Sequence, residues 1–342
     1  MGIVVLSLFD GISCGRLALE RAGIKVNKYY ASEIDKNAIK ISNNNYKDII
    51  QLGDIRNINE DIIKKIGKID LVLGGSPCQG FSRAGKGLNF EDNRSKLFFN
   101  FVNILNIVKK YNPNVKFLLE NVQMKKEWIE VISEYMGVEA ISINSKLVSA
   151  QNRPRLYWTN INFNSIEDKN IKLIDILDDT EFDYIEYEGI RVCKSISDNS
   201  RKLISNVNGE IRIKQAVKKG YIVANNGDGV NLSFPLSKSR RGRVVKEKSN
   251  CLDTQCNICI YHNGNIRRLT IEEMEKLQTL PIGYTKGVTE RQRIKAVGNG
   301  WTVDVVSHIL KGLIKRNKNE SNKKIETVKL GSVNAEQFKW VI

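Results

Sequence analysis

Histidine is nearly absent from this chain of 342 residues, which contains only His262 and His308. A catalytic triad built on histidine and a histidine-rich metal site are therefore not expected. The chain also has no apolar run approaching the roughly 20 residues that a membrane-spanning helix needs. Its first residues, Met1 to Leu6, are apolar with no basic region before them, so we expect a buried first strand and not a signal peptide.

Cysteine is also scarce. Six cysteines in a chain of this length do not make the pattern of a disulfide scaffold, so we expect an intracellular protein with reduced thiols. Cys251, Cys256, Cys259 and His262 raise the question of a zinc site. Because Cys256 alternates with isoleucines like one face of a strand, and no second paired-cysteine motif is present, we expect strand cysteines and no metal.

Acidic residues are too few to balance the charge of the chain. Asp and Glu total 38 against 54 Lys and Arg, which gives a formal net charge of +16. Such an excess favours a polyanionic partner, and nucleic acid is the usual one. The alternative is a general abundance of Lys, Asn and Ile, as in low-GC organisms. With 41% hydrophobic residues, the chain can bury the core of one large domain or of two ordinary ones.

Apolar runs of strand length alternate with helical segments up to about residue 160. Ile3–Phe9 is followed by a glycine-containing turn and a helical stretch, and further strands are expected at 28–32, 49–55, 68–73 and 116–119. This alternation predicts an α/β fold with a doubly wound, mostly parallel sheet. Open sheets of this class place ligands at the carboxyl ends of their strands.

Polar side chains follow the first three expected strands. Gly11 lies in a turn whose open backbone and following helix suit an anionic or polar cofactor, although the full G-x-G-x-x-G pattern is absent. Glu33 ends the second strand about 20 residues later, where an acid commonly binds ribose hydroxyls. Asp54 ends the third strand. We therefore expect a nucleotide-like pocket; the alternative for Glu33 is a surface carboxylate.

A tight loop, Gly74–Ser82, follows the strand at 68–73. Pro77 stiffens this loop and removes one backbone donor. Cys78 is then held at a fixed place at the edge of the sheet, where it could act as a nucleophile. The alternative is a buried structural cysteine, since unpaired cysteines are usually buried.

Two further segments could contribute to the same edge. Glu120 ends the strand at 116–119 and could be a buried acid beside the cysteine loop; the alternative is a helix-capping Glu-Asn pair. Gln151, Arg153 and Arg155 occupy alternate positions, so they share one face of an extended segment. That face would contact an anion or a base; the alternative is a solvent-exposed basic strand.

The composition changes after about residue 160. The following region has short segments, Gly/Asn/Asp turns and scattered basic residues, which predict a smaller β-rich domain facing nucleic acid. A capped helix begins after Thr270, with Glu273 three residues later. We predict a catalytic domain at 1–160 plus 267–316, a second domain at 161–266 and a C-terminal extension at 317–342.

Taken together, these segments resemble the DNA cytosine carbon-5 methyltransferases over roughly residues 3–160 and 266–313. The resemblance implies a Rossmann-like fold that binds S-adenosylmethionine, with 161–266 as a target-recognition domain. The motifs occur in the order typical of that family. They are Phe9-Asp10-Gly11, Glu33, Asp54, Gly75-Ser76-Pro77-Cys78-Gln79, Glu120-Asn121-Val122, Gln151-x-Arg153-x-Arg155, Arg268-Leu269-Thr270 and Gly298-Asn299.

The resemblance implies a sequence-specific DNA methyltransferase and gives each catalytic residue a role. The Cys78 thiolate would add to carbon 6 of a cytosine flipped out of the duplex. Glu120 would engage ring N3. Arg153 and Arg155 would contact the flipped base and nearby backbone, with Arg155 nearer the base carbonyl. Methyl transfer from S-adenosylmethionine to carbon 5 would follow.

The resemblance also implies the cofactor contacts, with some departures from the common pattern. The usual double glycine of the first motif is replaced by Ser13-Cys14, and the usual Asn-Ser pair near the C-terminus by Asn299-Gly300. The Phe9-Asp10-Gly11 start and the Gly298-x-x-Trp301 ending look more like the de novo animal enzymes and some phage-type bacterial ones. The predicted cofactor residues are Phe9, Gly11, Glu33, Asp54, Pro77, Leu97, Asn299 and Trp301.

Double-stranded DNA is the partner that the resemblance implies. The variable region of the protein, residues 161–266, would read the target sequence of the DNA. We further expect a monomer without a membrane partner, in the cytoplasm of a bacterial cell or a phage-infected host. The expected role is restriction-modification beside a cognate restriction endonuclease, phage self-protection, or orphan methylation. The predicted DNA contacts are Gln79, Ser82, Gln151, Arg240, Arg241 and Arg243.

Two alternatives stay open. One is a transfer-RNA cytosine methyltransferase on the same fold, although the Cys-Phe-Thr tripeptide of that branch is absent. The other is an inactive, DNA-binding relative, which predicts loss of the nucleophile or the acid. Cys78, Glu120, Arg153 and Arg155 are all present, which favours an active enzyme.

Overall fold

The computed structural model describes residues 2–76, 95–254 and 257–314. Contacts between residues divide this part of the chain into two compact units. The first contains the described residues up to 145, together with 153–163 and 278–314. The second contains 146–152 and the described residues of 164–277. In the ranges described, no helix combines the length and the apolar character needed to cross a membrane.

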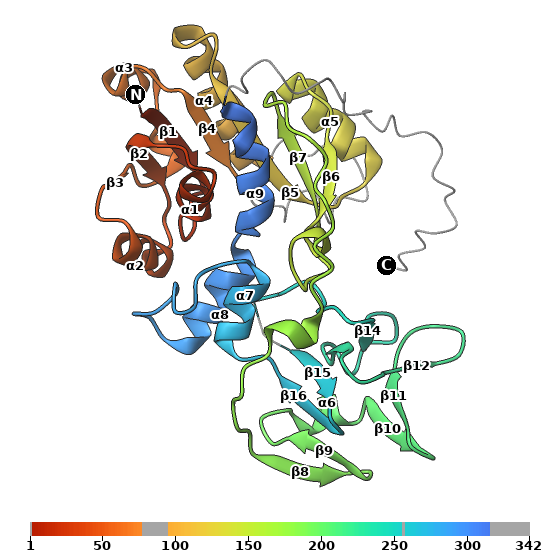
Figure 1. Cartoon of the computed structure of the whole chain (residues 1–342). Helices are drawn as coiled ribbons and strands as arrows, with labels where there is room; N and C mark the ends of the chain where they lie inside the picture. The colour runs from red at the N-terminus through yellow and green to blue at the C-terminus, as the bar shows by residue number, and fades with distance from the viewer. Residues whose placement is uncertain (1, 77–94, 255–256, 315–342) are drawn as a thin grey trace. The chain divides into compact units, whose positions relative to one another are not determined.

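The first unit is built on a seven-stranded sheet with the order β3-β2-β1-β4-β5-β7-β6 (Figure 1). Neighbouring strands from β3 to β5 are parallel, and β7 runs antiparallel to both β5 and β6. The strands are β1 (Ile3–Leu8), β2 (Val26–Ser32), β3 (Ile49–Gln51), β4 (Leu71–Gly74), β5 (Lys116–Val122), β6 (Ile141–Asn144) and β7 (Pro154–Thr159).

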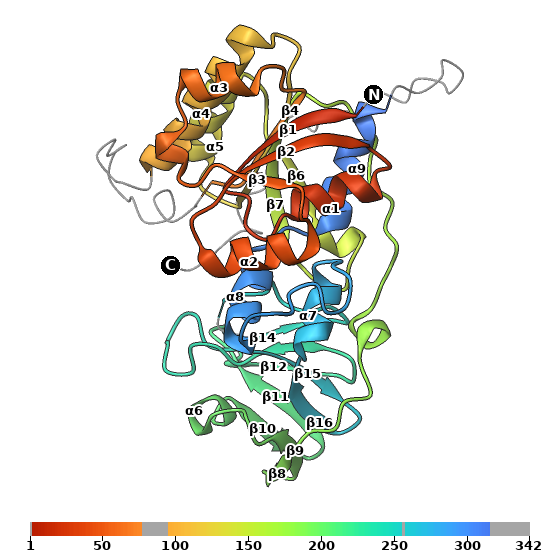
Figure 2. The same cartoon turned by 90° about the vertical axis from the view of Figure 1, so that its left-hand side faces the viewer.

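Helices cover both faces of this sheet (Figure 2). One face packs against α3, α4 and α5 in a core that includes Phe101, Phe117 and Trp158; α1 and α9 lie on the other face. The central strands are buried on both sides, which explains their continuous apolar sequences. The helices of this unit are α1 (Cys14–Arg21), α2 (Lys36–Asn45), α3 (Glu60–Ile66), α4 (Ser95–Tyr111), α5 (Lys126–Met136), α8 (Glu290–Asn299) and α9 (Val303–Leu310).

The strand order reverses between β1 and β4. From β1 the chain proceeds outward to β2 and β3, and from β4 it proceeds in the other direction to β5. Leu8 and Gly74, the last residues of β1 and β4, are register partners. The loops that leave these two strands therefore begin side by side, at the crevice where folds of this class bind ligands.

The second unit is dominated by β-structure and has its own apolar core, which includes Val192, Ile213 and Val230. A six-stranded sheet has the order β14-β13-β15-β16-β9-β8, and a three-stranded sheet has the order β10-β11-β12. The elements are β8 (Tyr184–Tyr187), β9 (Ile190–Cys193), α6 (Asp198–Arg201), β10 (Ile204–Val207), β11 (Glu210–Lys214), β12 (Tyr221–Val223), β13 (Gly229–Asn231), β14 (Arg243–Val245), β15 (Ile258–His262), β16 (Asn265–Arg268) and α7 (Ile271–Leu277).

The predicted fold class is confirmed: the chain is α/β, with a mostly parallel central sheet and additional β-sheets. The capped helix is also confirmed, because the Glu273 amide donates to Thr270 Oγ1 at 3.1 Å and the Thr270 amide donates to Glu273 Oε2 at 2.8 Å. This helix, α7, groups with the second unit, whereas the sequence led us to place it with the first. The roles of the two units stay predictions.

Candidate active site

The turn after β1 approaches the end of β2 through Glu33. Glu33 Oε2 accepts a hydrogen bond from the Gly11 amide at 2.8 Å, and Oε1 accepts from the Ile34 and Asp35 amides at 2.7 and 2.8 Å. Gly11 has a φ of +59°, and a Cβ added there would meet no atom within 4 Å. Two predicted cofactor residues are therefore brought together, beside open space.

Asp10 lies at the centre of a polar network behind this turn. Its Oδ1 accepts a hydrogen bond from the Tyr29 hydroxyl at 2.7 Å, and its Oδ2 accepts one from the Ser13 hydroxyl. The Ser13 hydroxyl also meets that of Ser42. Burial raises the pKa of Asp10 to about 6, against hydrogen bonds that act to lower it. We predicted no role for Asp10 from the sequence, although its position beside Gly11 was a signal.

The end of β4 lies against both Trp301 and Glu120. A Cβ added to Gly75 would lie 2.9 Å from Trp301 Nε1 and 3.4 Å from Glu120 Oε2. On the other side, a Cβ added to Gly15 would lie 2.7 Å from Leu73 Cδ1 and 3.5 Å from the Trp301 ring. A side chain at Gly75 would have to displace the indole, and one at Gly15 would have to displace the Leu73 methyl group. Trp301 thus lies between the first turn of α1 and the end of β4.

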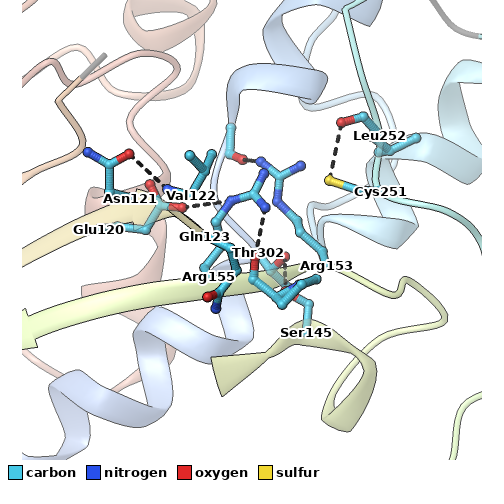
Figure 3. A network of polar contacts seen from close by, with 12 residues as sticks. Glu120, Asn121, Val122, Gln123, Ser145, Arg153, Arg155, Cys251, Leu252 and Thr302 are labelled. Atoms are coloured by element: carbon cyan, nitrogen blue, oxygen red, sulfur yellow. Dashed lines mark hydrogen bonds and ion pairs between the residues drawn. The ribbon is translucent and has the colours of Figure 1, made fainter. Parts of the chain in front are cut away.

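Glu120 and Arg155 form an ion pair across β5 and β7 (Figure 3). The distance from Arg155 Nε to Glu120 Oε1 is 3.1 Å, and each side chain keeps 12% of its exposure. The antiparallel register pairs Arg155 with Val122, on the same strand as Glu120. The two groups are thereby fixed next to each other, and each is only partly exposed.

Asn121 connects the end of β5 with the cysteine loop. Its Nδ2 donates to Ser76 O at 3.3 Å and to Ser76 Oγ at 3.1 Å. The alternative that Glu120 and Asn121 cap a helix is wrong, since both lie within β5 and α5 begins only at Lys126. Asn121 instead fixes the residue from which the chain continues toward Cys78.

Arg153 occupies a different environment from Arg155. It is 3% exposed, and its Nη2 donates to Gly298 O at 3.2 Å and Gly300 O at 3.0 Å. The alternative of a solvent-exposed basic strand is therefore wrong. These bonds favour a role in holding the turn that carries Trp301 over direct contact with a base.

Gln278, which the sequence reasoning missed, supports the same turn. Its Nε2 donates to Val297 O at 2.9 Å and to Gly300 O at 3.0 Å, while its Oε1 accepts from the Thr302 hydroxyl at 2.8 Å. The side chain is fully buried. A glutamine just after an amphipathic helix gives no signal of such a role in the sequence.

Gln151 is held by main-chain groups of its own unit. It belongs to the second unit, where its Nε2 donates to Leu277 O at 3.1 Å and its Oε1 accepts from the Leu252 amide at 2.9 Å. It is fully buried. This geometry favours a structural role over the DNA contact that we predicted.

The remaining predicted cofactor residues occupy varied environments. Phe9 and Leu97 are half-buried against the core that contains α3, α4 and α5. Asp54 follows β3 and holds the Arg56 side chain, whose hydrogen bond keeps the pKa of Asp54 below its ordinary value. Asn299 is exposed at the end of α8.

Several predictions fall outside the described residues. Cys78 and Pro77 belong to this group, as do the predicted DNA contacts Gln79 and Ser82. Cys256, one of the four residues considered as zinc ligands, does so too. Arg240, Arg241 and Arg243 are described, in or next to the loop that joins β13 to β14 of the second unit.

Comparison with known proteins gives a consistent answer. Residues 3–315 match the family described as C-5 cytosine-specific DNA methylase. The chain is 30% identical over 327 residues to the Type II methyltransferase M1.ScrFI of Lactococcus lactis subsp. cremoris, with 91% of this chain and 77% of the relative covered. It is 27% identical over 333 residues to the Type II methyltransferase M.HhaI of Haemophilus parahaemolyticus, with 90% and 93% covered.

A solved structure supports the fold. The S. pombe Dnmt2 methyltransferase matches with a TM-score of 0.59 and 18% sequence identity, and the match covers 91% of this chain and 98% of that one. At that identity the likeness concerns the fold alone. The family match, however, extends from the first strand to beyond the last described helix, so the chain belongs to the C-5 cytosine-specific DNA methylases and is a DNA cytosine-5 methyltransferase.

Proposed function

We propose that this enzyme transfers the methyl group of S-adenosylmethionine to carbon 5 of a cytosine turned out of double-stranded DNA. A stacked and paired base cannot be reached by side chains at the edge of a sheet, so extrusion is required. The observation that carries the proposal is the Glu120–Arg155 pair, which lies beside Gly75 on the segment leading to Cys78. A carboxyl group and a guanidinium in contact match the N3 and carbonyl edge of cytosine.

Cys78 supplies the nucleophile in this proposal. Carbon 5 of cytosine is a poor nucleophile until the thiolate adds to carbon 6. The sulfur–carbon bond forms as the C5–C6 double bond opens, which leaves its electron pair on carbon 5 to take the methyl group. Loss of the carbon 5 proton to water then restores the double bond and expels the thiolate.

Glu120 and Arg155 hold the base during this addition. Glu120 holds or protonates ring N3, which draws electron density from carbon 6 and lowers the barrier to thiolate attack. Arg155 donates to the base carbonyl. Their ion pair at 3.1 Å fixes both groups before the base arrives, and such preorganisation is more effective in a site that is largely shielded from water.

The ends of β1 and β2 fit S-adenosylmethionine, whose sulfonium makes the methyl group electrophilic. Gly11 lets the cofactor approach the backbone closely, because no atom lies near the position of a Cβ there. Glu33 is held by backbone amides and can accept ribose hydroxyls with its remaining lone pairs. Trp301 forms one wall, held by Arg153 through the preceding carbonyls.

Sequence recognition belongs to the second unit in this proposal. The loop 232–242 joins β13 to β14 and has no acidic residue, while Lys238, Arg240 and Arg241 are basic. Arg240 lies 4.4 Å from the centre of the Phe234 ring, and Leu236 is 83% exposed. Cations of this loop and Arg243 would contact phosphates and guanine edges.

The setting we propose is that of the relatives named as Type II methyltransferases. The enzyme would act as a monomer and protect the target sites of a cognate restriction endonuclease. Each protein–DNA encounter then needs only one catalytic site, since a single flipped cytosine is the substrate.

Labelled S-adenosylmethionine and unmethylated DNA test this proposal, followed by base-resolution mapping of modified cytosines. We expect methylation at carbon 5 of cytosine within one short sequence motif. Transfer to RNA and not to DNA, transfer to another base, or transfer at cytosines without a shared motif would contradict it.

A further inference from the structure

The turn between β1 and α1 has an unusual backbone. Gly11 and Ser13 are both left-handed, each with a φ of +59°, and Phe9 has a φ of +57°. Glycine adopts this region freely, but a residue with a Cβ adopts it only at a cost. Ser13 therefore has a backbone conformation that a glycine would adopt more readily.

Hydrogen bonds hold Ser13 in that conformation. Its amide donates to Asp10 O at 3.1 Å, and its hydroxyl donates to Asp10 Oδ2 and meets the Ser42 hydroxyl on α2. Tyr29 of β2 holds the other carboxylate oxygen. The network therefore joins β1, β2 and α2 around one serine side chain.

Ser13 does not contact a ligand directly through its side chain. Its exposure is 0%, and its hydroxyl does not cap α1, although the residue occupies the N-cap position. The Tyr284 hydroxyl donates a hydrogen bond to the carbonyl oxygen of Ile12, within the same turn, at 2.8 Å. The Ser13 hydroxyl and the Ile12 carbonyl thus have hydrogen-bond partners inside the protein, while Gly11 lies beside open space.

We propose that Asp10 is a positioning residue for the cofactor: through Ser13 it holds the turn Gly11–Ser13 in the left-handed form that presents its backbone to S-adenosylmethionine. This inference rests on the proposed cofactor. It assigns a function to a buried carboxylate that takes no part in the methyl-transfer steps. It also explains how the chain tolerates a serine with a left-handed backbone.

A matched pair of variants tests the inference. Ser13→Ala and Ser13→Gly both lose the hydroxyl and differ by one methyl group, but only glycine adopts the left-handed form without strain. The measurement is the equilibrium dissociation constant of S-adenosylhomocysteine by calorimetry, because this ligand has no sulfonium charge that would respond to Asp10 directly. Amide hydrogen exchange in residues 10–15 gives a second readout.

We expect Ser13→Ala to weaken binding about 5- to 30-fold, the range that a left-handed residue with a Cβ implies. Ser13→Gly should stay within about threefold of the unaltered protein. Asp10→Asn should weaken binding like Ser13→Ala and speed amide exchange in the turn. The double variant Asp10→Asn/Ser13→Gly should recover the affinity and the slow amide exchange of the unaltered protein, because glycine does not need the network to hold its left-handed conformation.

Equal losses in Ser13→Ala and Ser13→Gly would overturn the inference, since the hydroxyl itself would then be what binding requires. Failure of the double variant to recover affinity would also overturn it, and would leave the proposed function standing. If the unaltered protein bound no S-adenosylhomocysteine and no S-adenosylmethionine, the proposed function would fail and this inference with it.

Discussion

The side chains at the carboxyl edge of the central sheet and those of the loop between β13 and β14 differ in burial and in their hydrogen-bond partners. At the sheet edge, Glu120 and Arg155 are paired and mostly buried, and Asp10 is held by hydroxyl groups from two directions. In the loop, Leu236 is 83% exposed and Arg240 lies over the exposed ring of Phe234. One region is fixed before a ligand arrives, and the other presents cations and apolar groups to solvent.

This difference matches the two tasks that we propose. Chemistry on a single base requires groups held in one geometry, because small displacements of reacting atoms are costly in rate. Reading DNA relies on charge that attracts the backbone and on side chains that can adjust to base edges. Substitutions at the sheet edge should therefore change turnover, and substitutions in the loop should change DNA affinity.

The largest effect is expected for Cys78→Ala. Methyl transfer should be abolished, because the thiolate that adds to carbon 6 is lost, while the dissociation constant of S-adenosylmethionine should stay nearly unchanged. Turnover with saturating DNA and calorimetry with the cofactor measure the two quantities. Near-normal turnover by this variant would remove Cys78 from the mechanism.

Glu120→Gln should slow methyl transfer by about 10²-fold or more, as loss of a general acid does. Glutamine keeps the shape of the side chain but cannot supply a proton to N3. Single-turnover rates at saturating DNA and cofactor measure this step.

Glu130→Gln on α5 is a matched control, because Glu130 is 63% exposed and pairs only at the surface with Lys126, 3.6 Å away. Its single-turnover rate should equal that of the unaltered enzyme. A Glu120→Gln variant as fast as this control would contradict the acid role.

Leu236→Ser should weaken DNA binding about 10- to 150-fold, since burial of a leucine side chain contributes about 1.5–3 kcal/mol. The salt dependence of binding should not change, because no charge is lost. Arg240→Ala, in contrast, should reduce the slope of log affinity against log salt by about one. Fluorescence anisotropy over a range of salt concentrations measures both.

Ile282→Ser is the control for the loop, since Ile282 is 63% exposed in the first unit. Its DNA affinity should match that of the unaltered protein. If it weakened binding as much as Leu236→Ser, the assignment of recognition to the loop would be lost.

The smallest effect concerns pH. The pKa of Asp10 rises from 3.8 to about 6 because of burial, so the folded state binds its proton more readily than the unfolded state. Its contribution to stability is therefore present below about pH 4 and is lost as the pH rises through about 6. Asp10→Asn should lose less stability than the unaltered protein between pH 4 and pH 7, as measured by urea unfolding. Identical losses would show that Asp10 titrates normally.

The sequence predicted the mostly parallel sheet well, for physical reasons. Continuous apolar strands, as in Ile3–Leu8, have few alternatives to a buried parallel sheet. Acids and glycines at strand ends, such as Gly11 and Glu33, were therefore placed together correctly. Roles of individual residues within that edge were harder to predict.

Arg153 and Arg155 show why. Alternate spacing places both on one face of a strand, but Arg155 lies in β7 and Arg153 precedes it, where the chain departs from the strand. The partners of Arg153 are carbonyl groups of Gly298 and Gly300, far away in the sequence. No local pattern encodes such a contact, and the same holds for Gln278.

Covalent trapping tests the central claim most directly. DNA with 5-fluorocytosine at the mapped target cannot lose a proton from carbon 5 after methyl transfer, so elimination of the thiolate is blocked. We predict a stable protein–DNA adduct that needs S-adenosylmethionine, with mass spectrometry locating the base on the peptide that contains Cys78. An enzyme that methylates ordinary target DNA but forms no adduct, or an adduct on another residue, would contradict the account.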